Sequence, residues 1–190
     1  MTTTVRILGI SGSLRKQSYN TALLRAAQQR QTEACTLAAA TLQGIPLYDG
    51  DLEQAEGIPA AVNTLKEQIL ACDGLLLVTP EYNNGIPGVF KNAIDWLSRV
   101  PATTPALLAG RPVAIIGASP GGFGTVSSQA MWLPVLKSLG MLTWSEGRLL
   151  VSRAHKAFDA QGKLLDDNVS QQLQEFLQRY AKFVGRHGQA

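Results

Sequence analysis

The feature that most constrains the fold is a regular alternation of short apolar runs with longer segments of helical period. Four apolar runs, each ending in turn-forming residues, lie at 5–10, 74–79, 112–118 and 147–151, and a weaker fifth lies at 35–42. They lack the strict alternation of half-buried strands, which is typical of strands covered on both faces. We therefore predict a sheet of five strands with helices on both sides.

The segments between these runs have the spacing of amphipathic helices. Apolar residues recur at helical intervals over 19–31, 59–72, 88–99 and 125–139. Strands that alternate with helices imply right-handed crossovers and a parallel sheet. The sequence thus predicts an α/β fold, a doubly wound three-layer sandwich around a five-stranded parallel sheet, built by a single domain over 1–190.

A fifth helix is predicted near the end of the chain, over 168–184. Leu173, Tyr180 and their apolar neighbours repeat at helical spacing there. Asn168 is the predicted N-cap and Gly185 the predicted stop, since these residue types favour those two positions.

Composition and charge exclude several classes of protein. The 17 basic and 14 acidic residues are scattered, without the like-charged run of a nucleic-acid surface. No segment approaches the roughly 20 apolar residues of a membrane span. The two cysteines, Cys35 and Cys72, form no metal or redox motif and are expected in the core. We expect no nucleic acid, membrane or metal partner, and a cytoplasmic location.

Ligands of doubly wound folds bind outside the carboxyl ends of the strands, where the strand order reverses. The loops to examine are therefore 10–20, 79–88 and 117–125, which follow the runs at 5–10, 74–79 and 112–118.

The first loop has the features of an anion site. Ser11, Ser13, Ser18 and Asn20 offer short polar side chains, Arg15 offers a forked cation, and the following helix begins with free backbone amides. The signatures of a P-loop, a phosphatase cysteine loop and a dinucleotide loop are all missing. A terminal phosphomonoester therefore fits better than a pyrophosphate. The alternative is that these residues only cap the helix and Arg15 is solvated.

The second loop carries Glu81 and Tyr82 to the edge of the sheet and turns at Asn83, Asn84 and Gly85. Backbone amides in such a turn suit the carbonyl and ring nitrogens of a flat heterocycle, and Tyr82 would cover it. The alternative is a plain turn with a surface carboxylate.

The third loop contains Ser119 and the glycines Gly121, Gly122 and Gly124. Glycines let the backbone approach a ligand closely, although they would serve a tight turn equally well.

Four segments in combination resemble the NADPH-dependent FMN reductase family, which includes bacterial quinone, chromate and azo reductases. They are GSLRKQSYN (12–20), IPLYD (45–49), PEYNNGIPGVFKNAIDWLSR (80–99) and GASPGGFGT (117–125). The resemblance implies a flavodoxin-like fold with strand order 2-1-3-4-5, FMN as cofactor and NADPH or NADH as reductant. It also implies a homodimer or homotetramer, and a ping-pong reaction in which a small-molecule electron acceptor follows the nicotinamide nucleotide.

The family resemblance also assigns the binding residues by motif. The FMN phosphate would lie against the first loop, and the isoalloxazine and ribityl chain against the other two. The residues implied are Ser13, Leu14, Arg15, Ser18, Tyr19, Asn20, Pro80, Glu81, Tyr82, Asn83, Ser119 and Gly122.

The chain departs from the family's pattern at two places. Several relatives have arginine, glutamine and tyrosine after the third loop, in a tetramer contact, where this chain reads VSSQAM over 126–131. Relatives also commonly have an aromatic residue where this chain has Asn84.

The sequence suggests no catalytic side chain, because the only two histidines, His155 and His187, are distant from the three loops and a flavin accepts hydride itself. Three alternatives stay open. The chain could be a flavodoxin-like electron carrier, a reductase that supplies diffusible reduced FMN to a monooxygenase, or a scaffold without flavin turnover.

Overall fold

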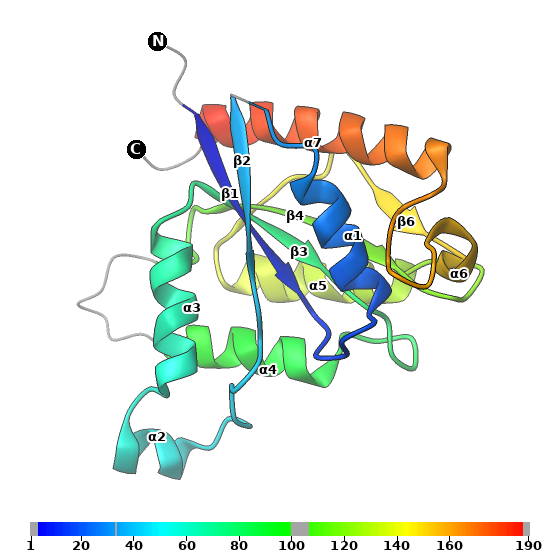
Figure 1. Cartoon of the computed structure of the whole chain (residues 1–190). Coiled ribbons are helices and arrows are strands. Elements are labelled where there is room, and N and C mark those ends of the chain that lie inside the picture. The colour runs from blue at the N-terminus through cyan, green and yellow to red at the C-terminus, as the bar shows by residue number, and fades with distance from the viewer. Residues whose placement is uncertain (1–3, 33, 100–106, 188–190) are drawn as a thin grey trace.

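The computed structural model describes residues 4–32, 34–99 and 107–187 (Figure 1). Within these ranges the strands are β1 (Val5–Ser11), β2 (Cys35–Ala40), β3 (Gly74–Val78), β4 (Pro112–Ala118), β5 (Leu142–Thr143) and β6 (Leu149–Val151). They pair in the order β2-β1-β3-β4-β5, with β6 also on β4, and every pairing is parallel. The predicted fold class and strand order are confirmed.

The last position of the sheet is divided between two short strands. β5 pairs with Pro112 and Val113 at the start of β4, and β6 pairs with 116–118 at its end. The run predicted at 147–151 corresponds to β6 alone. A two-residue strand such as β5 gives no detectable run in a sequence.

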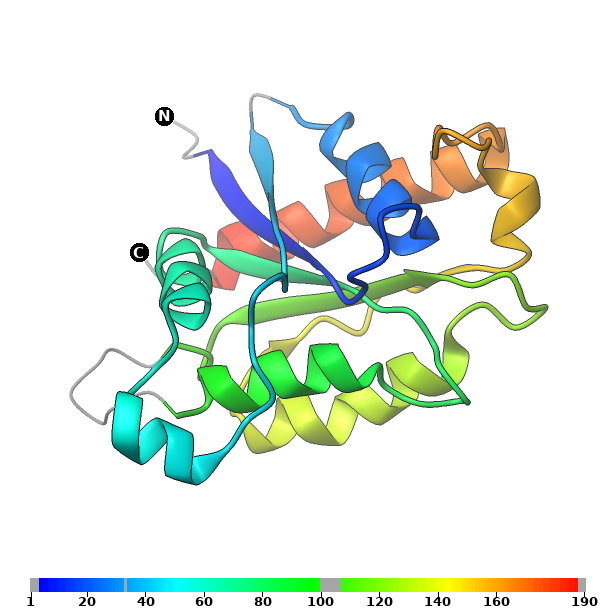
Figure 2. The ribbon, with the colours of Figure 1, turned by 60° about the horizontal axis from the view of Figure 1, so that its bottom comes forward.

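The helices are α1 (Tyr19–Gln28), α2 (Gly50–Glu56), α3 (Ala60–Leu70), α4 (Gly88–Leu97), α5 (Val126–Ser138), α6 (Ala154–Ala157) and α7 (Asp167–His187). Figure 2 shows α1 and α7 on one side of the sheet and α3, α4 and α5 on the other. The five predicted helices are present within a few residues of their expected bounds. α2 and α6 were not predicted, because both are too short for a helical period.

Two apolar cores, one on each face of the sheet, hold the three layers together. Neighbouring strand residues enter opposite cores: Leu75 packs against the side of α3 and α4, and Leu76 against the side of α1 and α7. Each fully buried side chain of this size stabilises the fold by about 1.5–3 kcal/mol. Burial on both faces explains why the strands read as continuous apolar runs.

The ends of α7 differ from the prediction. Asp166 is the N-cap, since its Oδ1 accepts a hydrogen bond from the amide of Val169 at 3.0 Å. The predicted N-cap Asn168 is therefore wrong, because Asp166 caps the helix two residues earlier. The predicted stop at Gly185 is also wrong, because the helix continues to His187. A Cβ at Gly185 would lie 3.4 Å from Cγ2 of Val5, which is an ordinary contact distance inside a helix packed on β1.

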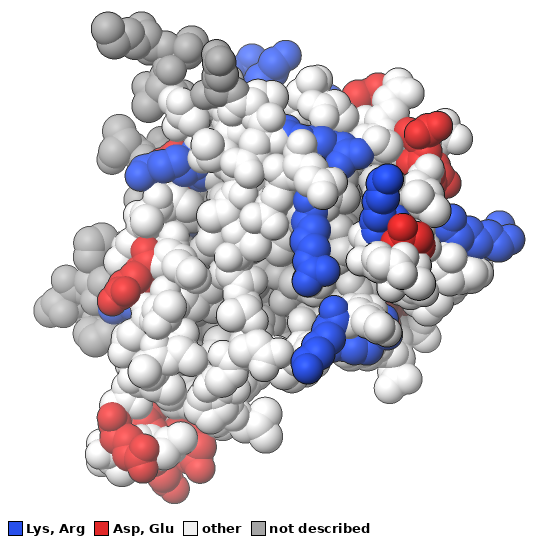
Figure 3. All heavy atoms as spheres, in the orientation of Figure 1, with Lys and Arg blue, Asp and Glu red and all other residues white. Residues whose placement is uncertain are grey.

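The charged side chains are unevenly placed on the face seen in Figure 3. Acidic residues gather at α2, and lysine and arginine gather over α1 and the loop before it. Cys72 is buried and Cys35 is half-buried, and both are free thiols, so the expected full burial holds only for Cys72. Within the described ranges, every helix is too short or too polar to cross a bilayer.

Candidate functional site

The three loops after β1, β3 and β4 meet at the carboxyl edge of the sheet and enclose a cavity of about 230 Å³. The cavity is lined by Ser13, Arg15, Ser18, Tyr19, Asn20, Pro80, Glu81, Tyr82, Ala118, Ser119 and Pro120. Nine of the twelve predicted site residues are among them, and Leu14, Asn83 and Gly122 are not. Ala118 and Pro120 were not predicted, because neither carries a polar side chain that could signal a site.

The loop after β1 presents unused hydrogen-bond donors. Ser18 caps α1, and its Oγ accepts from the amide of Asn20 at 3.2 Å. In the ranges that the structure describes, the amides of Lys16, Gln17 and Tyr19 donate to no protein atom. These groups lie at the positive end of the α1 dipole, which favours a bound anion.

Arg15 is available for such an anion. Its guanidinium lies over the ring of Tyr19, with 5.8 Å between Cζ and the ring centroid. Across the described part of the chain it has no ion pair. Arginine in this setting suits a phosphate, to which it donates two parallel hydrogen bonds.

Asn20 is buried and already engaged. Its Nδ2 donates to the carbonyl of Ala118 at 2.8 Å, and its Oδ1 accepts from the amide of Ala118 at 2.9 Å. Both polar ends of the side chain therefore join α1 to the end of β4. Asn20 thereby fixes the position of the first loop relative to the third loop.

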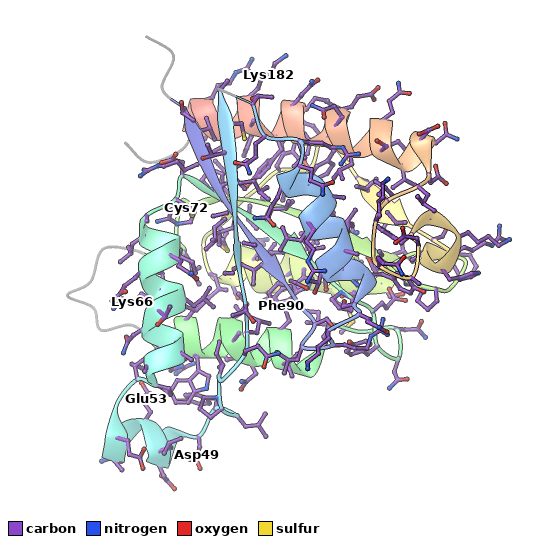
Figure 4. The ribbon with its side chains drawn as sticks, in the orientation of Figure 1. Asp49, Glu53, Lys66, Cys72, Phe90 and Lys182 are labelled. Carbon is purple, nitrogen blue, oxygen red and sulfur yellow. The ribbon has the colours of Figure 1, made fainter. Side chains whose placement is uncertain are left out.

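Gly12 allows the first loop to lie close to the second. A Cβ at this position would lie 2.2 Å from Cδ1 of Phe90 and 2.9 Å from Cδ of Pro80. Figure 4 shows Phe90 on α4, near the carboxyl end of β1. Since real Cβ atoms do not approach so closely, only glycine fits here without a shift of its neighbours.

The second loop ends in a tight hairpin turn. Tyr82 and Gly85 exchange two backbone hydrogen bonds, and Asn83 and Asn84 between them have φ of 51° and 58°. Positive φ at both central residues defines a type I′ turn, in which asparagine is favoured. The turn projects Tyr82, 52% exposed, toward the first loop, where its hydroxyl lies 3.4 Å from Oγ of Ser13.

Glu81 is bound to the start of α5. Its Oε2 accepts hydrogen bonds from the amides of Ser127 at 2.8 Å and Ser128 at 3.0 Å. A carboxylate at this place satisfies two free amides and complements the helix dipole. The carboxylate therefore fixes the second loop against α5.

The third loop is tied to the elements that follow it. The amide of Ser119 donates to Val151 on β6 at 2.9 Å, and the amide of Arg153 donates to Gly121 at 2.9 Å. Gly122 lies beyond these bonds in an exposed stretch, and a Cβ there would meet nothing within 4 Å. Within the described residues, no three metal-ligating side chains cluster.

A doubly wound parallel sheet with the strand order 2-1-3-4-5, and a cavity outside the carboxyl ends of its strands, is typical of flavodoxin-like proteins. The chain belongs to the NADPH-dependent FMN reductase family, whose sequence model matches residues 5–156. It is an oxidoreductase, with FMN and NADPH or NADH as the expected cofactors.

Individual relatives agree with this assignment over nearly their whole length. The chain is 44% identical to an NAD(P)H-dependent FMN reductase of Pseudomonas aeruginosa over 98% of both chains. It is 35% identical to a quinone reductase of Escherichia coli K12, again over 98% of both chains. Among solved structures, it resembles the NAD(P)H:acceptor oxidoreductase FerB of Paracoccus denitrificans with a TM-score of 0.86 and 31% identity, over 98% of this chain and 100% of that one.

Proposed function

We propose that the loop after β1 binds the phosphate of FMN. The observation that carries this proposal is the position of Arg15, a cation without an ion pair within the described residues, beside the unused amides at the start of α1. Ser13 and Ser18 add hydroxyl groups, and the backbone of Leu14 and Tyr19 completes the loop. Asn20 acts through its bonds to Ala118, which set the position of the loop.

The isoalloxazine is proposed to lie between the second and third loops. Pro80, Glu81, Tyr82 and Asn83 would contact one edge of the ring through their backbone and through the Tyr82 ring. The ribityl side would meet Ser119 and Gly122. The cavity supports this arrangement, since its lining changes from hydroxyl groups and arginine at the first loop to Pro80 and Tyr82 at the second.

The chain's own part in the reaction is binding and orientation. When bound, FMN would supply the redox chemistry, namely hydride transfer from NADPH or NADH and electron transfer to an acceptor. No side chain is assigned as acid or base. Tyr82 lines the cavity and is 52% exposed, so the cavity is open to solvent on that side. This opening would permit the nucleotide and the acceptor to bind in turn, as a ping-pong cycle requires.

Quinones are the proposed acceptors, together with FMN itself. Relatives that support this choice are the quinone reductase of Escherichia coli and a 2-hydroxy-1,4-benzoquinone reductase of Burkholderia, the latter 33% identical over 95% of this chain.

The test is an anaerobic visible spectrum of protein that has been reconstituted with FMN and gel-filtered. A retained flavin band that bleaches with NADPH, and returns with benzoquinone, is the expected result. Flavin that elutes separately but turns over when added freely would favour a supplier of diffusible reduced FMN. Retained flavin that NADPH does not reduce would favour an electron carrier. If the protein neither retains flavin nor turns over added FMN, the proposal is overturned.

We also propose a homo-oligomer, dimer or tetramer, in which α5 contributes to the interface. Met131 and Leu133 on α5 are 49% and 51% exposed, and Phe123 before the helix is 84% exposed. A second cavity of about 310 Å³, between α5 and the divided edge of the sheet, includes Ala130 and Leu133. Burying such a surface in a partner copy removes apolar area from water. A light-scattering mass of 20.3 kDa, that of one chain, would contradict this proposal.

The cytoplasm is the proposed compartment, supported by the two free thiols. Cell fractionation with an antibody to the chain tests it.

A further inference from the structure

A buried hydroxyl lies directly beneath the second loop of the site. The side chain of Thr79, at the end of β3, is 0% exposed and has three hydrogen-bond partners. Its Oγ1 lies 2.9 Å from the carbonyl oxygen of Pro80, 2.8 Å from Oγ of Ser128 and 3.1 Å from Nε1 of Trp132. Two of these partners belong to α5, so Thr79 connects that helix to the loop.

The directions of these three bonds follow from the chemistry of the groups. A carbonyl only accepts and an indole N–H only donates, whereas a hydroxyl donates once and accepts twice. The single proton of Thr79 must therefore go to the carbonyl of Pro80. It follows that Ser128 donates its own proton to Thr79. This is the one arrangement that satisfies all three contacts, and it uses the full capacity of the hydroxyl.

The bond to Pro80 fixes the orientation of the next peptide group. In a planar trans peptide, the carbonyl of Pro80 and the amide of Glu81 point in opposite directions. Since the carbonyl is held toward the buried Thr79, the amide of Glu81 points away from Thr79. Pro80 and Glu81 both line the cavity. This amide donates to no protein atom in the ranges that the structure describes.

The far end of the same residue is fixed as well. The carboxylate of Glu81 accepts from the amides of Ser127 and Ser128. Ser128 thus contacts the loop at two places: its amide donates to the carboxylate of Glu81, and its hydroxyl bonds to the hydroxyl of Thr79. A rotation of the Pro80–Glu81 peptide would break the bond between Thr79 and Pro80. The buried hydroxyl groups of Thr79 and Ser128 would then share one acceptor fewer, which costs free energy.

We propose that Thr79 is a positioning residue that holds the Glu81 amide toward the flavin, as a donor to a carbonyl oxygen of its ring. This inference rests on the flavin site proposed above. Carbonyl oxygens of the ring gain negative charge when the flavin is reduced, so a donor already in place favours the reduced form. The buried hydroxyl thereby raises the reduction potential of bound FMN without touching it.

The test compares Thr79→Val with Thr79→Ser in the FMN-loaded protein. Valine keeps the shape of threonine and removes the hydroxyl, whereas serine keeps the hydroxyl. We measure the midpoint potential of bound FMN and the dissociation constants of oxidised and reduced FMN. In Thr79→Val, affinity for reduced FMN should fall about tenfold more than affinity for oxidised FMN, since roughly one hydrogen bond is lost. That ratio corresponds to a midpoint potential lower by roughly 30 mV for a two-electron couple.

Thr79→Ser should keep the midpoint potential of the unaltered protein, because serine keeps the hydroxyl. If Thr79 only filled space, the valine variant would keep the potential instead, because valine keeps the shape. A Thr79→Val potential that is unchanged or raised would overturn the proposal while leaving the flavin site intact. Failure of the unaltered protein to bind either oxidised or reduced FMN would instead overturn the site itself, and the proposal with it.

A second measurement covers the case in which Thr79→Val does not fold. In the unaltered protein, the ¹H and ¹⁵N resonances of the Glu81 amide should shift when FMN binds and shift further on reduction under anaerobic conditions. The amide of Lys163, an exposed residue outside the cavity, is the internal control. A Glu81 amide that does not respond to FMN reduction would overturn the proposal.

Discussion

Asn20 and Ala118 are joined by a reciprocal pair of hydrogen bonds. The side-chain amide of Asn20 donates to the carbonyl of Ala118 and accepts from its backbone amide, at 2.8 and 2.9 Å. Both residues are at most 3% exposed. The first turn of α1 is thereby fixed to the last residue of β4, so the first loop and the third loop cannot move independently.

Replacement of Asn20 by alanine should destabilise the protein by about 2–4 kcal/mol, because two buried backbone groups of Ala118 lose their partners. Urea unfolding measures this difference. The control is Asn63→Ala, which removes an exposed side-chain bond to the carbonyl of Ile58 and should cost less than about 1 kcal/mol. Equal losses for the two variants would contradict the assigned role of Asn20.

Arg15→Ala should weaken FMN binding by about 10- to 100-fold, as expected for the loss of charge-assisted hydrogen bonds to phosphate. Fluorescence titration of the apoprotein measures it. Riboflavin lacks the phosphate, so its affinity should not change in this variant. Arg186→Ala, which removes an exposed arginine near the end of α7, controls for net charge and should bind FMN normally. If riboflavin and FMN lose affinity equally, Arg15 does not contact the phosphate.

Gly12→Ala should displace the first loop from the second. The added methyl group would overlap the buried ring of Phe90 and crowd Pro80. Overpacking of this kind costs about 1–3 kcal/mol, and the displaced loop should bind FMN more weakly. Gly88→Ala is the matched control, since its methyl group would meet nothing within 4 Å. Normal stability and FMN affinity in Gly12→Ala would show that the two loops tolerate separation.

The sequence predicts the sheet and the long helices well, because burial on both faces leaves a continuous apolar run and a long helix leaves a regular period. It misses β5, α2 and α6, which are too short for either signal. The position of the site is also predictable, since the carboxyl ends of neighbouring parallel strands meet at one edge. Nine of the twelve residues expected at the site therefore line one cavity.

The sequence does not predict the hydrogen-bond partners that the side chains of the site have within the protein. Asn20 pairs with a residue 98 positions away, and Glu81 with amides 46 and 47 positions away. Such contacts depend on how the helices pack on the sheet, and no local pattern indicates them. The same holds for Thr79, whose bonds to Ser128 and Trp132 cross from β3 to α5.

The ion pair of Arg6 and Asp73, at the edge of the sheet opposite the site, should make stability depend on acid pH. Arg6 donates to Asp73 from its backbone amide at 2.7 Å and from its guanidinium at 2.9 Å. Burial raises the pKa of the Asp73 carboxyl, but the hydrogen bonds from Arg6 and the charges of Arg6 and Arg111 together outweigh it. The pKa therefore lies below the ordinary value of 3.8.

A carboxyl whose pKa is lower in the folded state stabilises the fold above its ordinary pKa, and this contribution is lost as the pH falls through the folded-state value. Asp73→Asn should therefore cost about 1 kcal/mol at pH 7, since the pair is partly exposed. This cost should shrink as the pH falls below 3.8 and should vanish once the pH is below the folded-state pKa. Urea unfolding across this range measures the change. Asp95→Asn breaks the partly buried (i, i+4) pair with Lys91 on α4 and should cost about half as much at pH 7, as is usual for pairs of that spacing. A cost for Asp73→Asn that stays constant from pH 7 into acid would show that the ionised pair does not stabilise the fold.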